Sequence, residues 1–468
     1  MNRMPPERST ERSTARREAR EASEFLKSHP DVRAYHCFLT DLGGVARGKV
    51  LRPVELERAF SDGRPLPGSI LGLDITGADV EETGLVWEDG DADRVCWPVA
   101  GTLVPQPWSE EPSAQFLLTS VEADGSGSPG DPRQALGRVI DRFEPLGLTP
   151  VAAVELEFYV FDPAVIESGK PMPPRTAGNA RPSQLQAYLM QDLEDLGPFL
   201  DALYRGGEAM GLPLRTLISE YAPGQLEVVL QHRADALRAA DEAILYKRLV
   251  KGVARQHGLV ASFMAKPYAE HSGCGMHMHV SLADAAGSNV FADADPEGGP
   301  LLKQAIAGLQ ATMAESMAIF APNANSFRRF RANSYAPLAP TWGVNNRTVS
   351  LRVPAGAAET RHVEHRVAGA DANPYLGLAA VLAGMHKGIV ERLDPGPAVT
   401  GNGYLQKMAA TLPRNWYAAI DAAAQSGFLS DYLGARTMEI YLAIKRAELD
   451  RFMSQPTPLD FAWYLRQA

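Results

Sequence analysis

The chain has 468 residues, of which 45% are hydrophobic, and this length allows two domains with a substantial buried core. Its formal net charge of −10 argues against a nucleic acid as partner. No apolar run approaches 18 residues, which predicts a protein without membrane contact. The first residues lack a signal segment, and the three cysteines form no disulfide framework. Together these features predict a cytoplasmic protein.

The first quarter of the chain has the pattern of a small β-rich domain. Residues 1–20 are charged with little periodicity, and we expect a mobile tail. Residues 21–123 alternate short apolar runs with turns, which predicts strands over 34–39, 44–50, 94–97 and 115–119. Residues 124–131 carry the strongest turn signal in the chain and predict a linker.

The rest of the chain, residues 132–468, predicts a larger domain in which strands alternate with helices. Asp131 has the features of an N-cap, with Pro132 at the first helical position. Further helices are expected over residues 233–253 and 300–319, and we find no internal repeat. The C-terminal run Phe461-Ala-Trp-Tyr-Leu is apolar bulk that a monomer would expose, which indicates docking between subunits.

Two acidic side chains interrupt a run that otherwise predicts a buried strand. Glu155 and Glu157 lie between Val-Ala-Ala-Val and Phe-Tyr-Val-Phe. Positions i and i+2 of a strand share one face, roughly 6.6–7 Å apart. Such a pair is often only the solvated face of an edge strand. On a buried strand, however, two carboxylates are costly unless cations hold them, which favours two neighbouring divalent ions.

Other segments supply further acidic and imidazole groups. Glu220 and Glu227 flank an Ala-Pro-Gly turn that can bring both carboxylates to one site. His277 and His279 alternate in a predicted strand, and Glu364 lies in the run Val-Glu-His-Arg. Carboxylates with an imidazole and no thiolate suit Mg²⁺ or Mn²⁺ rather than Zn²⁺.

Seven arginines follow within fifty residues, and two of their segments alternate like strands. A guanidinium face opposite a carboxylate–metal cluster fits a polyphosphate held from both sides, which points to ATP. The seven are Arg328, Arg329, Arg331, Arg347, Arg352, Arg361 and Arg366.

On these motifs the chain resembles the glutamine synthetase superfamily, from about residue 31 to the end. Seven motifs follow the family's order: residues 155–157, 220–227, 261–267, 273–279, 322–326, 346–347 and 363–375. The resemblance implies an α+β fold with an N-terminal β-grasp domain and a C-terminal catalytic domain, in which helices back a curved antiparallel sheet. It also implies a homo-oligomer of two stacked hexamers, with active sites between neighbouring subunits.

The resemblance assigns roles residue by residue. It implies that Glu157, Glu220 and Glu227 hold a first metal ion, and that Glu155, His277 and Glu364 hold a second, with two to three Mg²⁺ or Mn²⁺ ions per site. Gly273, Arg329 and Arg366 would bind glutamate. For ATP, the co-substrate, the matching residues are His279, Arg347 and Arg352, and the catalytic positions are Arg329, Arg347 and Tyr335.

The implied chemistry transfers the γ-phosphoryl group of ATP to the γ-carboxylate of glutamate, after which an amine displaces phosphate from the acyl phosphate. Metals and arginines must cancel the repulsion between the two anions. No serine or cysteine nucleophile is needed.

The chain departs from glutamine synthetases where those enzymes bind ammonium. Tyr335 occupies the position of a loop glutamate, and Pro67 matches the aspartate that a neighbouring subunit supplies, although Asp74 could provide a carboxylate instead. An aromatic and apolar wall suits the alkyl part of a larger amine. The sequence thus resembles the γ-glutamylpolyamine synthetases and related glutamate–amine ligases.

We therefore expect ligation of glutamate to a primary amine in amine or polyamine assimilation, with putrescine or spermidine favoured. A small monoamine such as ethanolamine is the first alternative, ammonium-dependent glutamine synthesis the second, and a non-catalytic ring the third.

Two further departures concern the nucleotide and regulation. His362 stands where many relatives carry an arginine, and Arg361 is expected on the opposite face, so nucleotide binding is weaker or another arginine compensates. Ala410 replaces the tyrosine that some glutamine synthetases have nucleotidylated, which predicts that this control is absent.

Overall fold

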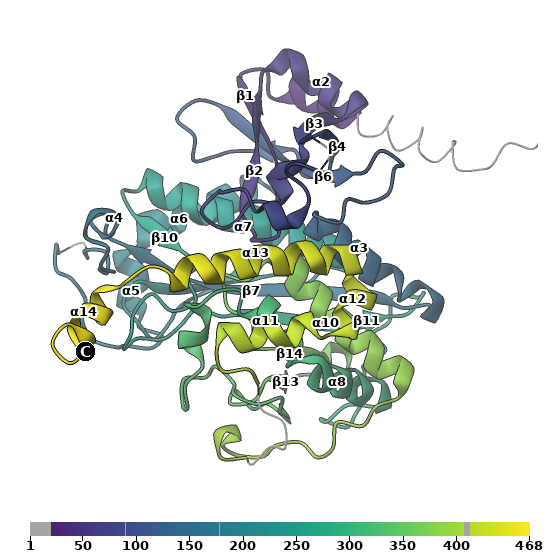
Figure 1. Cartoon of the computed structure of the whole chain (residues 1–468), viewed down its shortest axis with the longest axis vertical. Coiled ribbons are helices and arrows are strands. Elements are labelled where there is room, and N and C mark those ends of the chain that lie inside the picture. Colours follow the sequence, from purple (N-terminus) through teal and green to yellow (C-terminus); the bar gives the residue numbers. More distant parts are fainter. Residues whose placement is uncertain (1–19, 89, 177, 407–411) are drawn as a thin grey trace, which may run out of the picture.

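The computed structural model describes residues 20–88, 90–176, 178–406 and 412–468. Nearly all of the predicted tail, residues 1–20, lies outside them. Figure 1 shows a small N-terminal sheet beside a larger sheet that is surrounded by helices. The domain boundaries predicted at residues 21, 124 and 132 remain predictions.

The small sheet has the strand order β2-β1-β6-β4-β3, and β5 pairs with β6. β1 runs parallel to β6, while the other strand pairs of this sheet are antiparallel. All four predicted strands are present, but the sequence pattern missed the short β3 and β5. The strands are β1 (Ala34–Thr40), β2 (Ala46–Leu51), β3 (Arg64–Pro67), β4 (Asp93–Pro98), β5 (Val104–Pro105) and β6 (Ser113–Val121).

One face of the small sheet is covered by helix α2 (Pro53–Asp62). The helix buries Leu56, Ala59 and Phe60, and the Phe60 ring lies 5.1 Å from that of Phe116 on β6. Residues 20–28 are also helical. Two 3₁₀ turns follow in this region, η1 (Gly68–Leu71) and η2 (Glu81–Thr83).

The predicted N-cap at Asp131 is confirmed. Its side chain accepts a hydrogen bond from the Arg133 N–H at the start of α3 (Pro132–Asp141). The same carboxylate accepts hydrogen bonds from Thr119 and Ser120 on β6. One buried side chain therefore ties the small sheet to the first helix of the larger unit.

The larger sheet has the order β12-β13-β14-β11-β7-β9-β8, with β10 paired to β7. It is antiparallel, as predicted, except that β12 and β13 run parallel. Its strands are β7 (Thr149–Phe161), β8 (Leu214–Ser219), β9 (Gln225–Leu230), β10 (Val260–Ser262), β11 (Met276–Ala283), β12 (Trp342–Val344), β13 (Leu351–Val353) and β14 (Val363–His365).

The helix predicted over residues 300–319 is interrupted. The structure has α8 (Pro300–Thr312) and then α9 (Met317–Phe320), separated by four residues. At this break the Thr312 hydroxyl donates to the Gly308 carbonyl and the Ser316 hydroxyl donates to the Thr312 carbonyl. Side chains that bond to backbone carbonyls in this way weaken or bend a helix.

The other predicted helix is α7 (Ala236–Gln256), which begins three residues later than expected because the Asp235 side chain caps it. The remaining helices surround the large sheet (Figure 1). They are α4 (Val165–Ser168), α5 (Met190–Asp195), α6 (Gly197–Ala209), α10 (Pro374–Glu391), α11 (Trp416–Ala424), α12 (Gly427–Leu433), α13 (Ala435–Met453) and α14 (Pro458–Tyr464), with 3₁₀ turns η3 (Glu144–Leu146), η4 (Ser326–Arg329), η5 (Ala358–Thr360) and η6 (Gly403–Leu405).

Two features of the surface complete the fold. Among the described residues, no helix is both long and apolar enough to cross a membrane. The apolar C-terminal run is exposed in the single chain, with Phe461 and Trp463 on α14 each 59% accessible. Its docking on another subunit remains a prediction.

Candidate active site

The register of the large sheet brings the predicted ligands together. On β7, Glu155 lies opposite His277 of β11, and Glu157 lies opposite Glu227 of β9. Glu364 of β14 lies opposite His279 on one side and Arg352 of β13 on the other. Residues far apart in sequence thus become direct cross-strand neighbours, which is the closest side-chain pairing that a sheet offers.

Glu220 reaches the site through the predicted turn. It follows β8, and the chain returns as β9, antiparallel to β8, with Glu227 on it. Gly224 has φ +77°, and a Cβ there would lie 2.6 Å from the Val160 carbonyl oxygen, so this tight turn requires glycine. The prediction that the turn brings both carboxylates to one site is confirmed.

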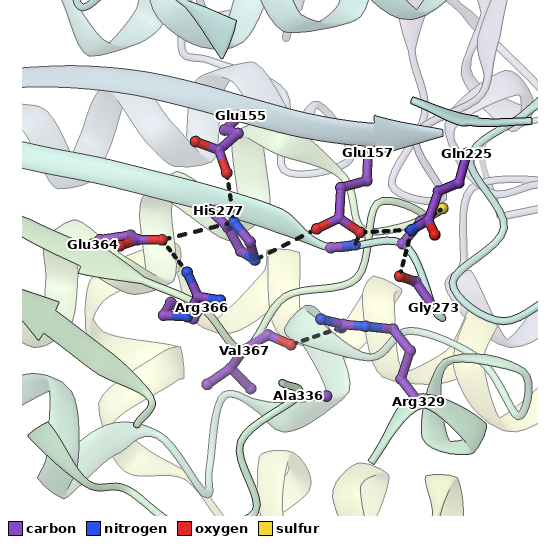
Figure 2. Close-up of polar contacts among 12 residues, drawn as sticks. Glu155, Glu157, Gln225, Gly273, His277, Arg329, Ala336, Glu364, Arg366 and Val367 are labelled. Carbon is purple, nitrogen blue, oxygen red and sulfur yellow. Dashed lines mark hydrogen bonds and ion pairs between the residues drawn. The ribbon is translucent and has the colours of Figure 1, made fainter. Parts of the chain in front are cut away.

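These side chains line one cavity of about 460 Å³. Of the predicted site residues, all except His279 line it: Glu155, Glu157, Glu220, Glu227, Gly273, His277, Arg329, Tyr335, Arg347, Arg352, Glu364 and Arg366. Figure 2 shows Glu155, Glu157 and Glu364 directed toward His277, with Arg366 beside Glu364 and Arg329 on the opposite side. The roles assigned to these residues remain predictions.

Glu155 is held by two imidazoles. His277 Nδ1 lies 2.8 Å from Glu155 Oε1, and His279 Nε2 lies 3.3 Å from Glu155 Oε2. Burial opposes ionisation, yet these hydrogen bonds hold the pKa of Glu155 well below its usual range. Burial, with Arg366 nearby, lowers the pKa of His277, which therefore favours the neutral form that binds metals.

Glu157 and Glu227 are less well balanced by positive charge: His277 Nε2 lies 3.9 Å from Glu157 Oε1, and Glu227 forms no ion pair among the described residues. Glu157 Oε2 accepts hydrogen bonds from the Gly275 N–H (3.0 Å) and from Gln225 Nε2 (3.2 Å). Burial and the charge of Glu220 raise the pKa of Glu157 to about 8, and burial with Glu155 and Glu157 raises that of Glu227 to about 11. At neutral pH the two carboxyls retain protons that a divalent cation would displace.

Glu364 is neutralised by arginines. Arg352 Nη1 lies 2.8 Å from Glu364 Oε2, and Arg366 forms a second ion pair with the other carboxylate oxygen. Burial disfavours the charge, but Arg366 and then His279 lower the pKa of Glu364 to about 2. The Nε atoms of Arg352 and Arg366 are buried without a hydrogen-bond partner in the described structure, as expected of donors that await an anion.

The ligand atoms converge in two groups, each within 4.8 Å. One group is Glu155, His279 and Glu364, and the other is Glu155, Glu227 and His277. Oxygen-rich donor sets with one imidazole fit Mg²⁺ or Mn²⁺. Glu155 belongs to both groups, whereas the family resemblance assigned it to the second metal ion alone. Glu157 and Glu220, which the resemblance assigned to the first metal ion, lie in neither group.

Gly273 and Arg329 are packed against each other. A Cβ on Gly273 would lie 2.3 Å from Arg329 Cγ and 2.6 Å from the Ala265 carbonyl oxygen. Arg329 is only 5% exposed, and its Nη1 donates to the Val367 carbonyl at 3.0 Å. Only glycine at position 273 allows the guanidinium to lie under the cavity.

Three tyrosines stand at the edge of the cavity, of which sequence reasoning found only Tyr335. Tyr188 and Tyr221 also line it, and the rings of Tyr221 and Tyr335 are 6.0 Å apart. Tyr188 and Tyr335 have φ values of +59° and +58°. Left-handed backbone at bulky residues is strained and is typical of functional loops.

A second cavity of about 640 Å³ adjoins the first and shares Glu155 and Val229 with it. His279 lies here, with its Nδ1 3.0 Å from His362 Nε2. Arg361 is buried and donates to the Asp293 carbonyl, which fits the expectation that it faces away. Arg215 lines the same cavity as His362 and is a candidate for the compensating arginine.

Other predicted residues lie apart from the cavity. Pro67 ends β3 and does not line it. Asp74 is buried in the small domain and forms an ion pair with Arg451, so its carboxylate is already engaged. Cys274, next to Gly273 in the chain, is fully buried, and this burial favours a packing role for its side chain. Ala410, on which the nucleotidylation prediction rests, lies outside the described residues.

Divalent cations should stabilise the fold through the unpaired carboxylates. We expect Mg²⁺ or Mn²⁺ at a hundred times its Kd to add about 2.7 kcal/mol to the unfolding free energy. Glu227→Gln should remove most of this gain while leaving the cation-free protein as stable as before, because with a pKa of about 11 the Glu227 carboxyl is already neutral and the substitution puts a neutral amide in its place. Denaturant unfolding with and without EDTA measures both effects, and Glu208→Gln at an exposed position of α6 is the control. An unchanged cation effect in Glu227→Gln would contradict the assignment.

The contact between Gly273 and Arg329 predicts opposite effects for two glycine substitutions. Gly273→Ala should lower the free energy of unfolding by about 1–3 kcal/mol, because the added methyl overpacks the buried arginine. Gly137→Ala on α3, where nothing lies within 4 Å, should raise it by up to about 1 kcal/mol. Urea denaturation of the two variants tests this, and equal stabilities would show that Arg329 moves freely.

The comparisons with known proteins agree with this geometry. Residues 129–464 match the model of the glutamine synthetase catalytic domain. The chain is 40% identical to gamma-glutamylputrescine synthetase PuuA of Escherichia coli (strain K12), over 96% of this chain and 95% of that protein. It is 34% identical to glutamate–isopropylamine ligase of Pseudomonas sp, over 86% and 87% of the two chains.

Among solved structures, the chain resembles one titled "GmaS/ADP complex-Conformation 1". The TM-score is 0.82 and the sequence identity 28%, with 95% of this chain and 99% of that chain covered. The predicted α+β fold and family resemblance are thus confirmed, and the chain belongs to the glutamine synthetase family of ligases.

Proposed function

We propose that the protein joins the γ-carboxylate of L-glutamate to a primary amine at the expense of ATP, through γ-glutamyl phosphate. A polyamine such as putrescine or spermidine is the favoured amine. The observation that carries this proposal is the cavity in which five carboxylates and His277 face a wall of arginines, with tyrosines at its edge. The two relatives named for putrescine and isopropylamine support an amine larger than ammonia.

Glutamate would bind between Gly273, Arg329 and Arg366. The buried Arg329 and Arg366 guanidiniums offer charge-assisted hydrogen bonds to carboxylates. Arg347 is exposed and has no ion-pair partner among the described residues. Together with Arg352 it would offset the negative charge that builds up as the γ-carboxylate of glutamate approaches the γ-phosphoryl group of ATP.

Divalent cations would be held by Glu155, Glu157, Glu220, Glu227, His277 and Glu364. When bound, they supply positive charge against the phosphoryl oxygens, which lowers the repulsion between the two anionic substrates. Gln225 and the Gly275 N–H would keep Glu157 in place, because both already donate to its carboxylate.

ATP would extend into the adjoining cavity, where His279, His362 and Arg215 lie. Burial and the neighbouring His279 lower the pKa of His362 to about 4, so His362 is neutral at pH 7. A neutral imidazole is a weaker phosphate ligand than a guanidinium. We therefore assign Arg215, rather than His362, as the cationic contact of the nucleotide in this cavity.

The amine would enter past Tyr188, Tyr221 and Tyr335. Among the described residues, the only carboxylates that line the cavity are the five assigned to metal ions. The chain itself thus offers no spare carboxylate for an ammonium ion. Aromatic faces instead suit an alkylammonium, through cation–π attraction and apolar contact.

Two alternatives use the same machinery. A small monoamine such as ethanolamine would make fewer contacts with the tyrosines. True glutamine synthesis from ammonium would need a carboxylate supplied by another subunit. We also propose a cytoplasmic homo-oligomer of two stacked hexamers, and light scattering after size exclusion measures its mass.

A panel of amines tests the proposal. Phosphate release is measured with glutamate, ATP and Mg²⁺ plus ammonium, putrescine, spermidine, ethanolamine or isopropylamine. We expect the highest kcat/KM with putrescine or spermidine. Turnover with ammonium at millimolar concentration, and none with the amines, would overturn the assignment.

Exchange of Tyr335 tests the aromatic wall. Tyr335→Glu should raise the KM for the preferred amine about tenfold, which corresponds to the loss of one cation–π contact, and should increase turnover with ammonium. Tyr417→Glu, at an exposed tyrosine of α11, should leave both values unchanged. If Tyr335→Glu has the same kinetics as the parent with every amine, Tyr335 does not contact the amine.

A further inference from the structure

A third cavity, of about 490 Å³, lies between the two sheets. It is lined from the small domain by the β1–β2 loop and Ile75, and from the large domain by α7, α13 and the loops at residues 262–264 and 322–325. Figure 1 shows α7 and α13 beneath the small sheet. None of the residues assigned above to glutamate, ATP, amine or metal lines this cavity.

The wall formed by α7 carries three basic side chains without acidic partners. Lys247, Arg248 and Lys251 all line the cavity, and none forms a salt bridge in the described part of the chain. Lys247 Nζ has only the Ala372 carbonyl oxygen, 3.4 Å away, and the Phe263 ring at 5.2 Å. Arg248 donates to Gln115 Oε1 at 2.8 Å and lies over the Phe38 ring.

The two acidic groups of the cavity already have partners elsewhere, although Asp371 Oδ1 is buried without a hydrogen-bond partner in the described structure. Glu448 forms an ion pair with Lys445 at 2.7 Å and also accepts the Ile75 N–H at 2.9 Å. Asp371 accepts hydrogen bonds from Asn323 (2.8 Å) and Ser326 (2.7 Å). The cavity therefore holds four basic and two acidic side chains, a surplus of two positive charges in a chain whose net charge is −10.

Lys247 and Arg248 are half-buried whereas Lys251 is exposed, so the cost of an unpaired charge falls mainly on the first two. Burial, together with the charge of Lys251, lowers the pKa of Lys247 to about 7, so part of the repulsion is relieved by loss of a proton. An anion in the cavity would instead keep all three cations charged and paired. The Ser262 hydroxyl, which also lines the cavity, is a further potential donor.

We propose that this cavity binds a small oxyanion, a carboxylate or a phosphate, between Lys247, Arg248 and Lys251. The inference goes beyond the proposed reaction, because binding here needs neither glutamate nor ATP. Its volume admits a ligand larger than a single phosphate.

The cavity is connected to the active site through Asp371. Asp371 holds Ser326, the first residue of η4, and η4 ends at Arg329 beneath the glutamate cavity. An anion that attracts the α7 cations would shift the charge balance around Asp371. The KM for glutamate would then depend on the anion concentration. This consequence rests on the proposed function, whereas the binding of the anion does not.

Equilibrium dialysis of the full-length protein with radiolabelled inorganic phosphate or succinate, without divalent cations, tests the binding. We expect one anion per chain at this cavity, and the Lys247→Met/Lys251→Met double variant should weaken its binding at least about tenfold, because two charge-assisted contacts are lost. Lys387→Met, which removes a surface lysine paired with Glu391, should leave binding unchanged. The anion that binds more tightly identifies the ligand class.

Because the active-site arginines also attract anions, Arg347→Met is measured in parallel and should retain the binding that the double variant loses. Thermal unfolding checks that the variants fold, and the single Lys251→Met exchange at an exposed position provides a milder test. The proposal is overturned if neither anion binds the parent protein at millimolar concentration. Loss of binding in Arg347→Met, with retention in the double variant, overturns it equally.

Discussion

The structure depends on the electrostatics of five carboxylates that share one cavity with His277. Glu364 is balanced by Arg352 and Arg366, and Glu155 by two imidazoles. Glu157 and Glu227 face each other across β7 and β9, and among the described residues their one ion-pair partner is His277, 3.9 Å from Glu157. Neighbouring carboxylates in a buried site cannot all ionise unless positive charge is added. This charge arrangement supports the proposal that the carboxylates bind cations and the arginines bind anions.

The residues that line the cavity fall into three groups, which are carboxylates with His277, arginines and tyrosines. The strands β7, β9, β11 and β14 carry four of the carboxylates and His277, and Glu220 lies in the turn between β8 and β9. Arg329, Arg347 and Arg352 line the same cavity from the segment between β11 and β14. Tyr188 and Tyr335 occupy strained loop positions, and this strain persists only where the surrounding structure holds the residues in place. Such loops fit the edge at which we propose that an amine enters.

Much of this was predictable from local pattern. The alternation around Glu155 indicates a buried strand with two carboxylates on one face, and Asp131 with Pro132 indicates a helix start. Both follow from short-range geometry. The register that pairs Glu155 with His277 depends on strands more than a hundred residues apart, and local pattern does not specify it. The parallel pairing of β12 with β13 was missed for the same reason.

Several site residues had no sequence signal of their own. Tyr188 and Tyr221 lie outside regular alternation, and only their place beside Tyr335 in the fold shows that they line the cavity. Arg215 gave no signal because a lone exposed arginine is common on any surface. Gln225 lies within a recognised motif, but only its hydrogen bonds to Glu157 and the Gly273 carbonyl indicate that it orients a ligand.

The central claim is that these carboxylates together hold divalent cations. Crystals of the full-length protein soaked in MnCl₂ and measured at the manganese absorption edge test it directly. The account predicts at least two anomalous peaks in the cavity, each in contact with Glu155, Glu157, Glu220, Glu227, His277 or Glu364. Absence of any peak among these six side chains would contradict it.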